Sequence, residues 1–292
     1  MTRLLDVDLL LPRLERAFVE LSAGRASVPP RVAASVPELG LLAAMPGYVD
    51  GVLEAKLVTV YPGREPSHQA LIAVFDAQTG APRAVMDGTH ITAIRTGASS
   101  AVATRMLARE DARVLTVLGA GVQGRSHLDA VRRVRAFAEV RIASRTFEHA
   151  RALAEETGAA AVESFEEAVR GADVICCCTH ASEPVLRREW LAPGTHVCSV
   201  GASQEGPELD AETVADGLLC VESRVAFEPP PAGTFELQGL DPNAAAELGE
   251  VLAGARAGRD SNDQITVYKS MGHAVEDAAA AALVLELSSA GS

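Results

Sequence analysis

The feature that most constrains this chain is a glycine-rich hexapeptide, Gly-Ala-Gly-Val-Gln-Gly, at residues 119–124. It directly follows an apolar run at 113–118 and precedes a stretch with helical periodicity. In a strand–turn–helix unit, Gly119 permits the tight turn, Gly121 lets the backbone approach a pyrophosphate, and Gly124 lets helix and strand pack closely. The hexapeptide therefore predicts a dinucleotide-binding turn. Val122 and Gln123 belong to this turn, and the N-terminus of the helix after it would offer free N–H groups to the phosphates.

Alternating strand and helix signals continue beyond this turn. A helix is predicted at 126–134 and another at 149–157, and further strands are predicted at 140–144, 173–178, 196–200 and 217–221. Repeated units of this kind imply a parallel sheet covered by helices on both faces. The sequence therefore predicts an α/β fold, a doubly wound parallel sheet of the Rossmann type, over residues 113–272.

The chain before residue 113 has a different pattern. Strands are predicted at 53–61 and 70–76, with turn signals at Pro62-Gly63 and at 79–82, which indicate an antiparallel sheet. An alanine-rich helix at 91–107 leads into the nucleotide-binding part. We therefore expect a smaller α+β domain at 1–112, which binds substrate, and we expect the C-terminal helix at 273–292 to return to it.

Composition excludes several classes of function. The formal net charge of −13 argues against general affinity for nucleic acid, and no apolar run approaches the ~20 residues that cross a bilayer. The N-terminus is acidic where a signal peptide is basic, so we expect a cytoplasmic protein. Three of the five cysteines, 176–178, lie in one predicted strand, where neighbours point to opposite faces. We interpret them as small hydrophobic residues and predict no metal site.

The residues after the second predicted strand bear on the choice of cofactor. NAD-preferring folds usually place an acid there, whereas this chain has Ser144, Arg145 and Thr146. These side chains can hydrogen-bond or neutralise a 2′-phosphate. The sequence favours NADP(H), with NAD(H) possible. The alternative is that Arg145 is only a solvated side chain at the end of a strand.

Three basic residues in the first part of the chain are candidates for substrate binding. Lys56 falls within an otherwise apolar strand, Arg95 lies on the alanine-rich helix, and Arg31 follows two prolines. Converging Arg and Lys side chains would suit a carboxylate substrate. Taken singly, each is more often a surface charge.

These residues and several motifs resemble the ornithine cyclodeaminase and mu-crystallin family. The motifs include Met-Pro-Gly-Tyr at 45–48, Lys-Leu-Val-Thr-Val-Tyr-Pro-Gly at 56–63 and Lys-Ser-Met-Gly at 269–272. Further matching segments, in the same order, are 87–98, 119–124, 183–186, 200–203, 247–250 and 276–277. The resemblance covers nearly the whole chain.

The resemblance implies a homodimer whose first domains pair through their sheets, with the active site between that domain and the Rossmann domain. It implies that Arg31 and Arg95 bind the substrate carboxylate and that Lys56 contacts substrate and takes part in proton transfer. It also implies that Thr179 and the segment from Lys269 to Gly272 surround the nicotinamide.

One departure from the family pattern separates its activities. Cyclodeaminases have an aspartate where this chain has Ser203, and a serine cannot hold a proton as a carboxylate does near neutral pH. The chain therefore resembles the type that reduces cyclic ketimines. We expect an NADPH-dependent reductase of pyrroline- or piperideine-2-carboxylate, or the reverse amino-acid dehydrogenation. Ornithine cyclodeamination and non-catalytic NADPH binding remain alternatives.

Overall fold

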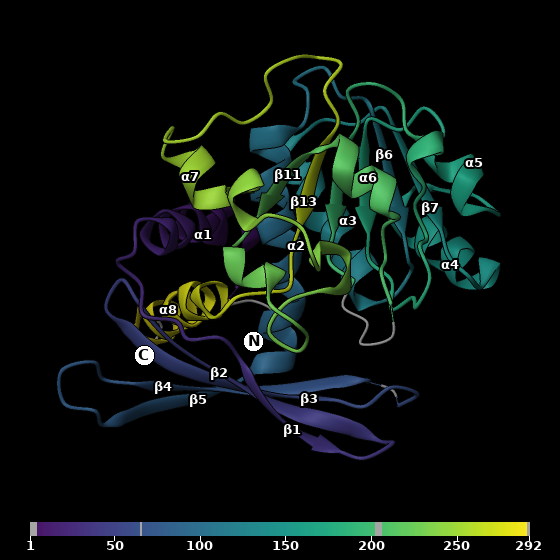
Figure 1. Ribbon diagram of the computed structural model, residues 1–292. Coiled ribbons are helices and arrows are strands. Elements are labelled where there is room, and N and C mark those ends of the chain that lie inside the picture. The colour runs from purple at the N-terminus through teal and green to yellow at the C-terminus, as the bar shows by residue number, and fades with distance from the viewer. Residues whose placement is uncertain (1–4, 65, 202–205, 291–292) are drawn as a thin grey trace.

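The computed structural model describes residues 5–64, 66–201 and 206–290. Two sheets organise the chain, and Figure 1 shows them as separate layers, with the helices on and around the second sheet and α8 lying over the first. The first part of the chain contains α1 (Val7–Ser22), β1 (Val32–Val36), β2 (Gly40–Val49), β3 (Val52–Val60), β4 (His68–Phe75), β5 (Pro82–Asp87) and α2 (Gly88–Leu107).

The rest of the chain builds the second sheet and its helices. Its elements are β6 (Val114–Leu118), α3 (Val122–Val134), β7 (Glu139–Ala143), α4 (Phe147–Thr157), β8 (Ala160–Ala161), α5 (Phe165–Val169), β9 (Val174–Cys177), β10 (His196–Ser199), α6 (Ala211–Asp216), β11 (Leu218–Val221), β12 (Ala246–Glu247), α7 (Leu248–Leu252), β13 (Thr266–Lys269) and α8 (Ala274–Ala290). Short 3₁₀ turns occur at Arg188–Trp190, Arg224–Phe227, Phe235–Leu237 and Pro242–Ala244.

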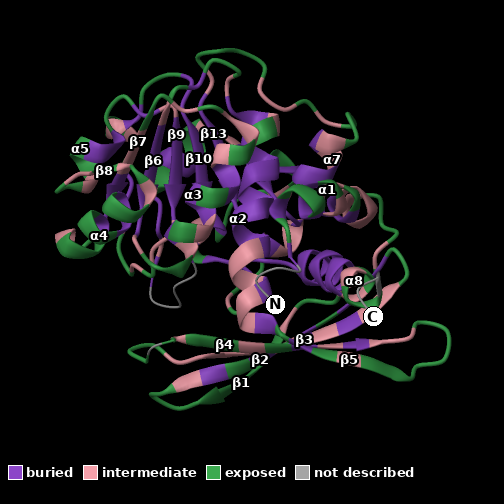
Figure 2. Cartoon of the chain, turned by 180° about the vertical axis from the view of Figure 1, so that it is seen from behind, coloured by how far each residue is buried: buried purple, intermediate pink, exposed green. Residues whose placement is uncertain are grey.

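The first sheet is an antiparallel meander in the order β1-β2-β3-β4-β5. Because side chains alternate along a strand, each strand offers one face to the core and one to the outside. Met45, Lys56, Ile72 and Met86 form one cross-strand row, and all four are buried. The inner face of the sheet therefore carries a buried lysine among apolar neighbours, while the opposite face stays largely exposed (Figure 2).

The second sheet has the order β12-β11-β13-β10-β9-β6-β7-β8, and all of its pairings are parallel. The predicted α/β class, a doubly wound parallel sheet with a smaller antiparallel part, is confirmed. Several elements were not predicted, among them α1, the strands β1, β2 and β5 of the first sheet, and the strand β13, which lies between β10 and β11. The prediction was also wrong about the start of α3, which begins at Val122 rather than residue 126 because the glycine turn itself enters the helix.

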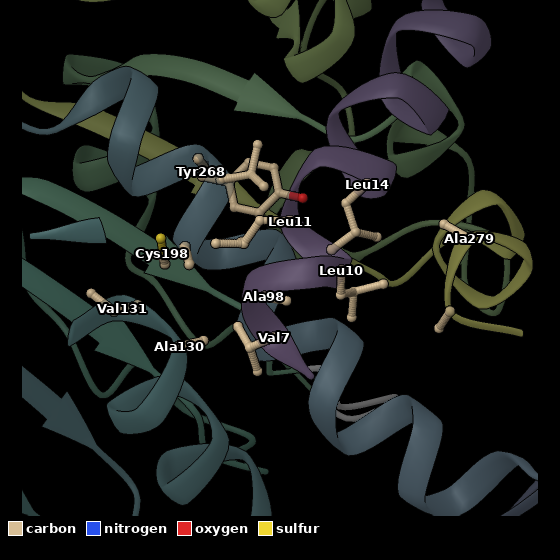
Figure 3. Packing of buried hydrophobic residues seen from close by; sticks show 14 of the residues in the cluster. Val7, Leu10, Leu11, Leu14, Ala98, Ala130, Val131, Cys198, Tyr268 and Ala279 are labelled. Carbon is tan, nitrogen blue, oxygen red and sulfur yellow. The ribbon is translucent and has the colours of Figure 1, made fainter. Parts of the chain in front are cut away.

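Helices α1, α2 and α8 join the two layers. α2 packs against α3 of the nucleotide-binding part and against α8, and α8 contacts α1, β2 and β3. Figure 3 shows the shared apolar core, in which Leu10 of α1, Ala98 of α2 and Ala279 of α8 lie in the same cluster as Tyr268 of β13. The C-terminal helix therefore stands between the two sheets. No helix in the described ranges has both the length and the hydropathy for a membrane span.

The cysteines lie in the core of the second sheet. Cys176, Cys198 and Cys220 are fully buried and belong to the main hydrophobic cluster. Cys198 also contacts the His196 ring at 3.2 Å. Within the described part of the chain, no group of three or more His, Cys, Asp or Glu side chains is arranged to hold a metal ion.

Candidate active site

The glycine turn has the geometry that a dinucleotide requires. Gly119 has φ +111°, and a Cβ there would lie 2.5 Å from the Cys178 carbonyl oxygen. A Cβ at Gly124 would overlap the Gly119 carbonyl oxygen. A Cβ at Gly121, by contrast, would meet no atom within 4 Å. Two glycines are therefore needed for packing, while the third leaves space at the N-terminus of α3, as a bound pyrophosphate would need.

The start of α3 is open to a ligand. Gly121 is its N-cap, and no side chain there accepts from the free N–H groups of the first turn. Val122 is 66% exposed, although it is apolar. Gln123 is half-buried, and its side-chain oxygen has no hydrogen-bond partner. These residues fit a site for an anion bound by backbone N–H groups.

Ser144, Arg145 and Thr146 border this turn. β7 ends at Ala143, whose carbonyl accepts from the Gly119 N–H at 2.8 Å, so the three residues follow at the same edge of the sheet. Arg145 and Thr146 are exposed, and Arg145 forms no ion pair within the described residues. A basic side chain is therefore available beside the turn.

Thr179 and Lys269 lie at the carboxyl end of the parallel strands in a buried polar network. The Thr179 N–H and hydroxyl both donate to Glu208 Oε1 at 2.7 Å. Lys269 Nζ donates to Ser199 Oγ and pairs with Glu236 at 3.0 Å. Because Lys269 is fully buried and has these partners, its direct contact with a cofactor stays a prediction. Sequence reasoning missed both glutamates.

The structure brings Lys56 and Arg95 together around acids of α8. Lys56 Nζ lies 2.7 Å from Asp277 Oδ2, and Arg95 Nε lies 3.0 Å from Asp277 Oδ1. Arg95 Nη1 also contacts Glu276 Oε2 at 3.0 Å. All four side chains are almost completely buried. Such pairs hold their geometry because separating them would leave an uncompensated charge in the protein interior.

Burial and neighbouring charges set the protonation of this cluster. Desolvation lowers the pKa of Lys56 to about 8, against the attraction of Asp277. Burial also opposes the charges of Asp277 and Arg95, but their mutual attraction and that of Lys56 and Glu276 lower the pKa of Asp277 and raise that of Arg95. Lys56 is thus a buried amine that remains mainly protonated at neutral pH and can release its proton slightly above it.

Arg31 approaches the cluster through the segment between β13 and α8. Its Nη2 donates to the carbonyl oxygens of Met271 at 2.9 Å and Gly272 at 2.5 Å. Gly272 has φ +72°, and a Cβ there would lie 2.7 Å from the Arg95 guanidinium nitrogens. Gly272 therefore lies between two of the predicted substrate-binding arginines.

Four further ionisable residues adjoin the three basic ones, and the sequence analysis gave none of them a role in the site: Glu54, Glu222, Glu276 and Asp277. Glu54 lies two residues before Lys56 on the same face of β3 and is 1% exposed with no partner for either oxygen. Burial and Asp277 raise its pKa to about 9, so it is uncharged at neutral pH. The sequence offered one indication of Glu276 and Asp277, because they are two adjacent acids at the start of the otherwise alanine-rich α8. Ser203 lies outside the described residues.

The charges of the cluster do not cancel. Arg31, Lys56 and Arg95 are basic, and two acids form ion pairs within this group: Asp277 pairs with Lys56 and Arg95, and Glu276 pairs with Arg95. His273 adds no positive charge, because burial and then Arg31 lower its pKa to about 3. When Glu222, whose pKa is raised to about 7, is protonated, one positive charge is left over beside a pocket lined by Arg31, Met45, Glu222 and Gly272, among others. Such a site suits a small anion.

The family model for the ornithine cyclodeaminase/mu-crystallin family matches residues 1–292. The chain belongs to this family. The mouse (Mus musculus) ketimine reductase mu-crystallin is 43% identical over 297 residues, which cover 97% of this chain and 93% of the mouse protein.

Two solved structures share the fold over almost the whole chain. The Thermococcus litoralis Δ1-pyrroline-2-carboxylate reductase, solved with NADH and L-proline, has a TM-score of 0.93 and 36% identity, covering 99% of this chain and 95% of its own. An archaeal alanine dehydrogenase dimer with bound NAD has a TM-score of 0.88 and 32% identity, covering 99% and 94%. These relatives are reductases and dehydrogenases by name.

Proposed function

We propose that this protein is an NAD(P)H-dependent oxidoreductase that reduces small cyclic imine carboxylates, such as pyrroline- or piperideine-2-carboxylate, and also catalyses the reverse oxidation of the amino acid. The observation that carries the proposal is the buried group of Arg31, Lys56 and Arg95, whose positive charge exceeds that of the two acids paired with it. A carboxylate bound there would complete the charge balance. The names of the mouse and Thermococcus relatives support the imine class.

The cofactor would bind on the glycine turn. Gly119, Gly121 and Gly124, with Val122 and Gln123, would hold the pyrophosphate against the N-terminus of α3. When bound, the nicotinamide supplies the hydride for the imine carbon.

We propose that NADP(H) is preferred, because Arg145 is exposed beside the turn without an ion-pair partner in the described part of the chain. Ser144 and Thr146 would add hydrogen bonds to the 2′-phosphate. Two relatives were solved with NADH or NAD, so NAD(H) is the alternative that the assay must compare. Thr179 and the segment from Lys269 to Gly272 would border the nicotinamide end.

The protein's own side chains would orient the substrate and supply the proton. Arg31 and Arg95 would bind the carboxylate, which fixes the direction of the C=N bond. Lys56 would donate a proton to the imine nitrogen, and its pKa of about 8 is close to the range in which proton transfer is efficient. Asp277 would keep Lys56 protonated and hold its Nζ in place through the 2.7 Å contact. In the oxidative direction the neutral Lys56 amine would accept the proton.

The test is an assay of NADPH and NADH oxidation with the two cyclic imine carboxylates, on the wild type and on the variants Lys56→Gln and Arg145→Ala. We expect turnover that Lys56→Gln abolishes, whereas Arg145→Ala raises KM for NADPH about tenfold and leaves KM for NADH unchanged. The exposed substitution Arg151→Ala on α4 is a matched control for Arg145→Ala. Equal KM values for NADPH and NADH in the wild type would contradict the cofactor preference.

Two outcomes would replace the proposed reaction. Release of ammonia from ornithine without net change in cofactor absorbance would establish a cyclodeaminase. Binding of NADPH without turnover of any imine carboxylate, in both the wild type and Lys56→Gln, would establish a non-catalytic binding protein.

We also propose that two copies pair through the outer face of the first sheet. Each of the five strands contributes an exposed apolar side chain to this face: Val32, Leu42, Leu57, Leu71 and Val85. Leu57 and Leu71 are directly opposite each other on β3 and β4. Contiguous apolar surface of this kind is typical of an interface. We expect a dimer by size-exclusion chromatography with light scattering, and a monomer for Leu57→Glu; a wild-type monomer would contradict the proposal.

A further inference from the structure

Glu222 is a buried acid that the proposed mechanism does not use. It follows β11 and lines the same small pocket as Arg31, Met271 and His273. The remaining lining is mostly apolar, including Pro29, Met45 and Val225. An acid in a pocket suited to a carboxylate needs an explanation, because its charge opposes that of the ligand.

One carboxyl oxygen of Glu222 accepts hydrogen bonds and the other has no partner. Oε1 accepts from the Met271 N–H at 2.5 Å and from Ser270 Oγ at 3.4 Å. Oε2 is buried and has no hydrogen-bond partner. The residue as a whole is 2% exposed. An unsatisfied carboxylate oxygen in this environment is costly when ionised, so the neutral acid is a low-energy alternative.

The anchored segment connects Glu222 with Arg31. Glu222 holds the N–H of Met271, and Arg31 holds the carbonyl oxygens of Met271 and Gly272. Glu222 and Arg31 therefore bind the same short segment beside one pocket, Glu222 through a backbone N–H group and Arg31 through backbone carbonyl oxygens. A ligand carboxylate that binds Arg31 would meet the negative charge of an ionised Glu222 in surroundings that screen it poorly.

The charges that face Glu222 come from several elements. Glu276 of α8 repels its negative charge, whereas Arg31 and the backbone N–H of Met271 favour it. His273 is uncharged, and the buried Tyr268 of β13 adds no charge at neutral pH, because burial raises its pKa. Burial is the largest influence, and together these raise the pKa of Glu222 to about 7.

We propose that Glu222 is a positioning residue that competes with the ligand carboxylate for Arg31, so that carboxylate binding draws a proton onto Glu222. Ionised Glu222 attracts Arg31 through space and repels the ligand carboxylate, which lowers the affinity of the site. Neutral Glu222 still anchors Met271 but no longer opposes the ligand. This inference rests on the proposed function, because it requires that the site bind a carboxylate.

The test is calorimetric titration of the NADPH-loaded protein with L-proline, repeated in buffers of different ionisation enthalpy. Proline itself does not titrate between pH 5.5 and 7.5, so any proton exchange belongs to the protein. At pH 7 we expect uptake of about half a proton, and we expect the affinity to fall several-fold, up to about tenfold, between pH 6 and 8. Lys56 contributes little uptake at pH 7, because most of it is already protonated below its pKa of about 8.

Glu222→Gln should remove the uptake at pH 7 and flatten the affinity below pH 7.5, while Glu212→Gln on the exposed surface of α6 should change neither. A purely structural role would alter the melting temperature but not the proton uptake. If Glu222→Gln does not fold, the wild-type titration decides alone, and binding without proton uptake would overturn the inference. Absence of proline binding at every pH would instead contradict the proposed function.

Discussion

Glu54 makes the pH dependence of folding measurable at one residue. The residue is 1% exposed, and neither carboxyl oxygen has a hydrogen-bond partner. Burial, followed by the charge of Asp277, raises its pKa from 4.5 to about 9. An acid whose pKa is raised by folding stabilises the folded state most below its unfolded pKa. That contribution is lost as the pH rises toward the folded pKa. Between pH 4.5 and 9, the folded protein must retain a proton that the unfolded chain gives up.

The size of the effect follows from that window. Each pH unit within it lowers the free energy of unfolding by about 1.4 kcal/mol, so raising the pH from 6 to 8.5 should remove about 3 kcal/mol through this residue alone. Glu54→Gln cannot ionise and should lack this loss. The variant should therefore gain about 3 kcal/mol relative to the wild type over the same change in pH.

The assay is urea unfolding at pH 6 and 8.5, at one fixed protein concentration. The pH-dependent difference between the variant and the wild type is the quantity to compare, because the buried amide of glutamine changes stability at every pH. Glu155→Gln, an exposed substitution on α4, is the control. If the wild type and Glu54→Gln lose equal stability between pH 6 and 8.5, the interpretation of Glu54 as a neutral acid is wrong.

Three further predictions follow from the site. Asp277→Asn leaves Lys56 and Arg95 short of a counter-ion, so we expect a loss of about 3–5 kcal/mol in urea unfolding and a lower pKa for Lys56; stability within 1 kcal/mol of the wild type would contradict this. Because Lys56 must be protonated to donate, the rate of imine reduction should fall above pH 8, and the rate of amine oxidation should rise. If the two rates vary in parallel with pH, Lys56 is not the proton donor and acceptor of both directions. Gly121→Ala should melt like the wild type but bind NADPH at least tenfold more weakly by fluorescence titration, whereas Gly124→Ala should also lower the melting temperature, because only the second Cβ meets the backbone.

Much of the nucleotide-binding part could be predicted from local pattern. The strands β6, β7, β9, β10 and β11 lie within two residues of their predicted bounds, because each is a short apolar run between a turn and a helix. The four-residue strand β13 was missed. The strand ends at the buried Lys269, and a charged residue weakens the apolar signal of so short a run. Its place between β10 and β11 also depends on pairing that chain order does not specify.

The candidate site was predictable only in part for the same reason. Lys56 could be selected because a lysine in an apolar strand is unusual, and Arg95 because it interrupts a run of small residues. Their partners Asp277 and Glu276 lie far along the chain, and the ion pair of Arg95 with Asp277 spans 182 positions. The presence of acids on α8 does not predict which basic residues they pair with. Tertiary packing of α8 between the two sheets makes that choice.

The late position of α8 also affects how the protein is made. Synthesis delivers Lys56 on β3 and Arg95 on α2 long before Asp277, so during translation these two cations lack the acid that pairs with both of them. Burying those cations without their partner is strongly unfavourable, which should delay closure of the core until the last helix leaves the ribosome. A chain that ends before α8 cannot bury Lys56 with its counter-ion, so it should stay open to proteolysis. The ion pairs with Asp277 would in this way separate complete chains from incomplete ones.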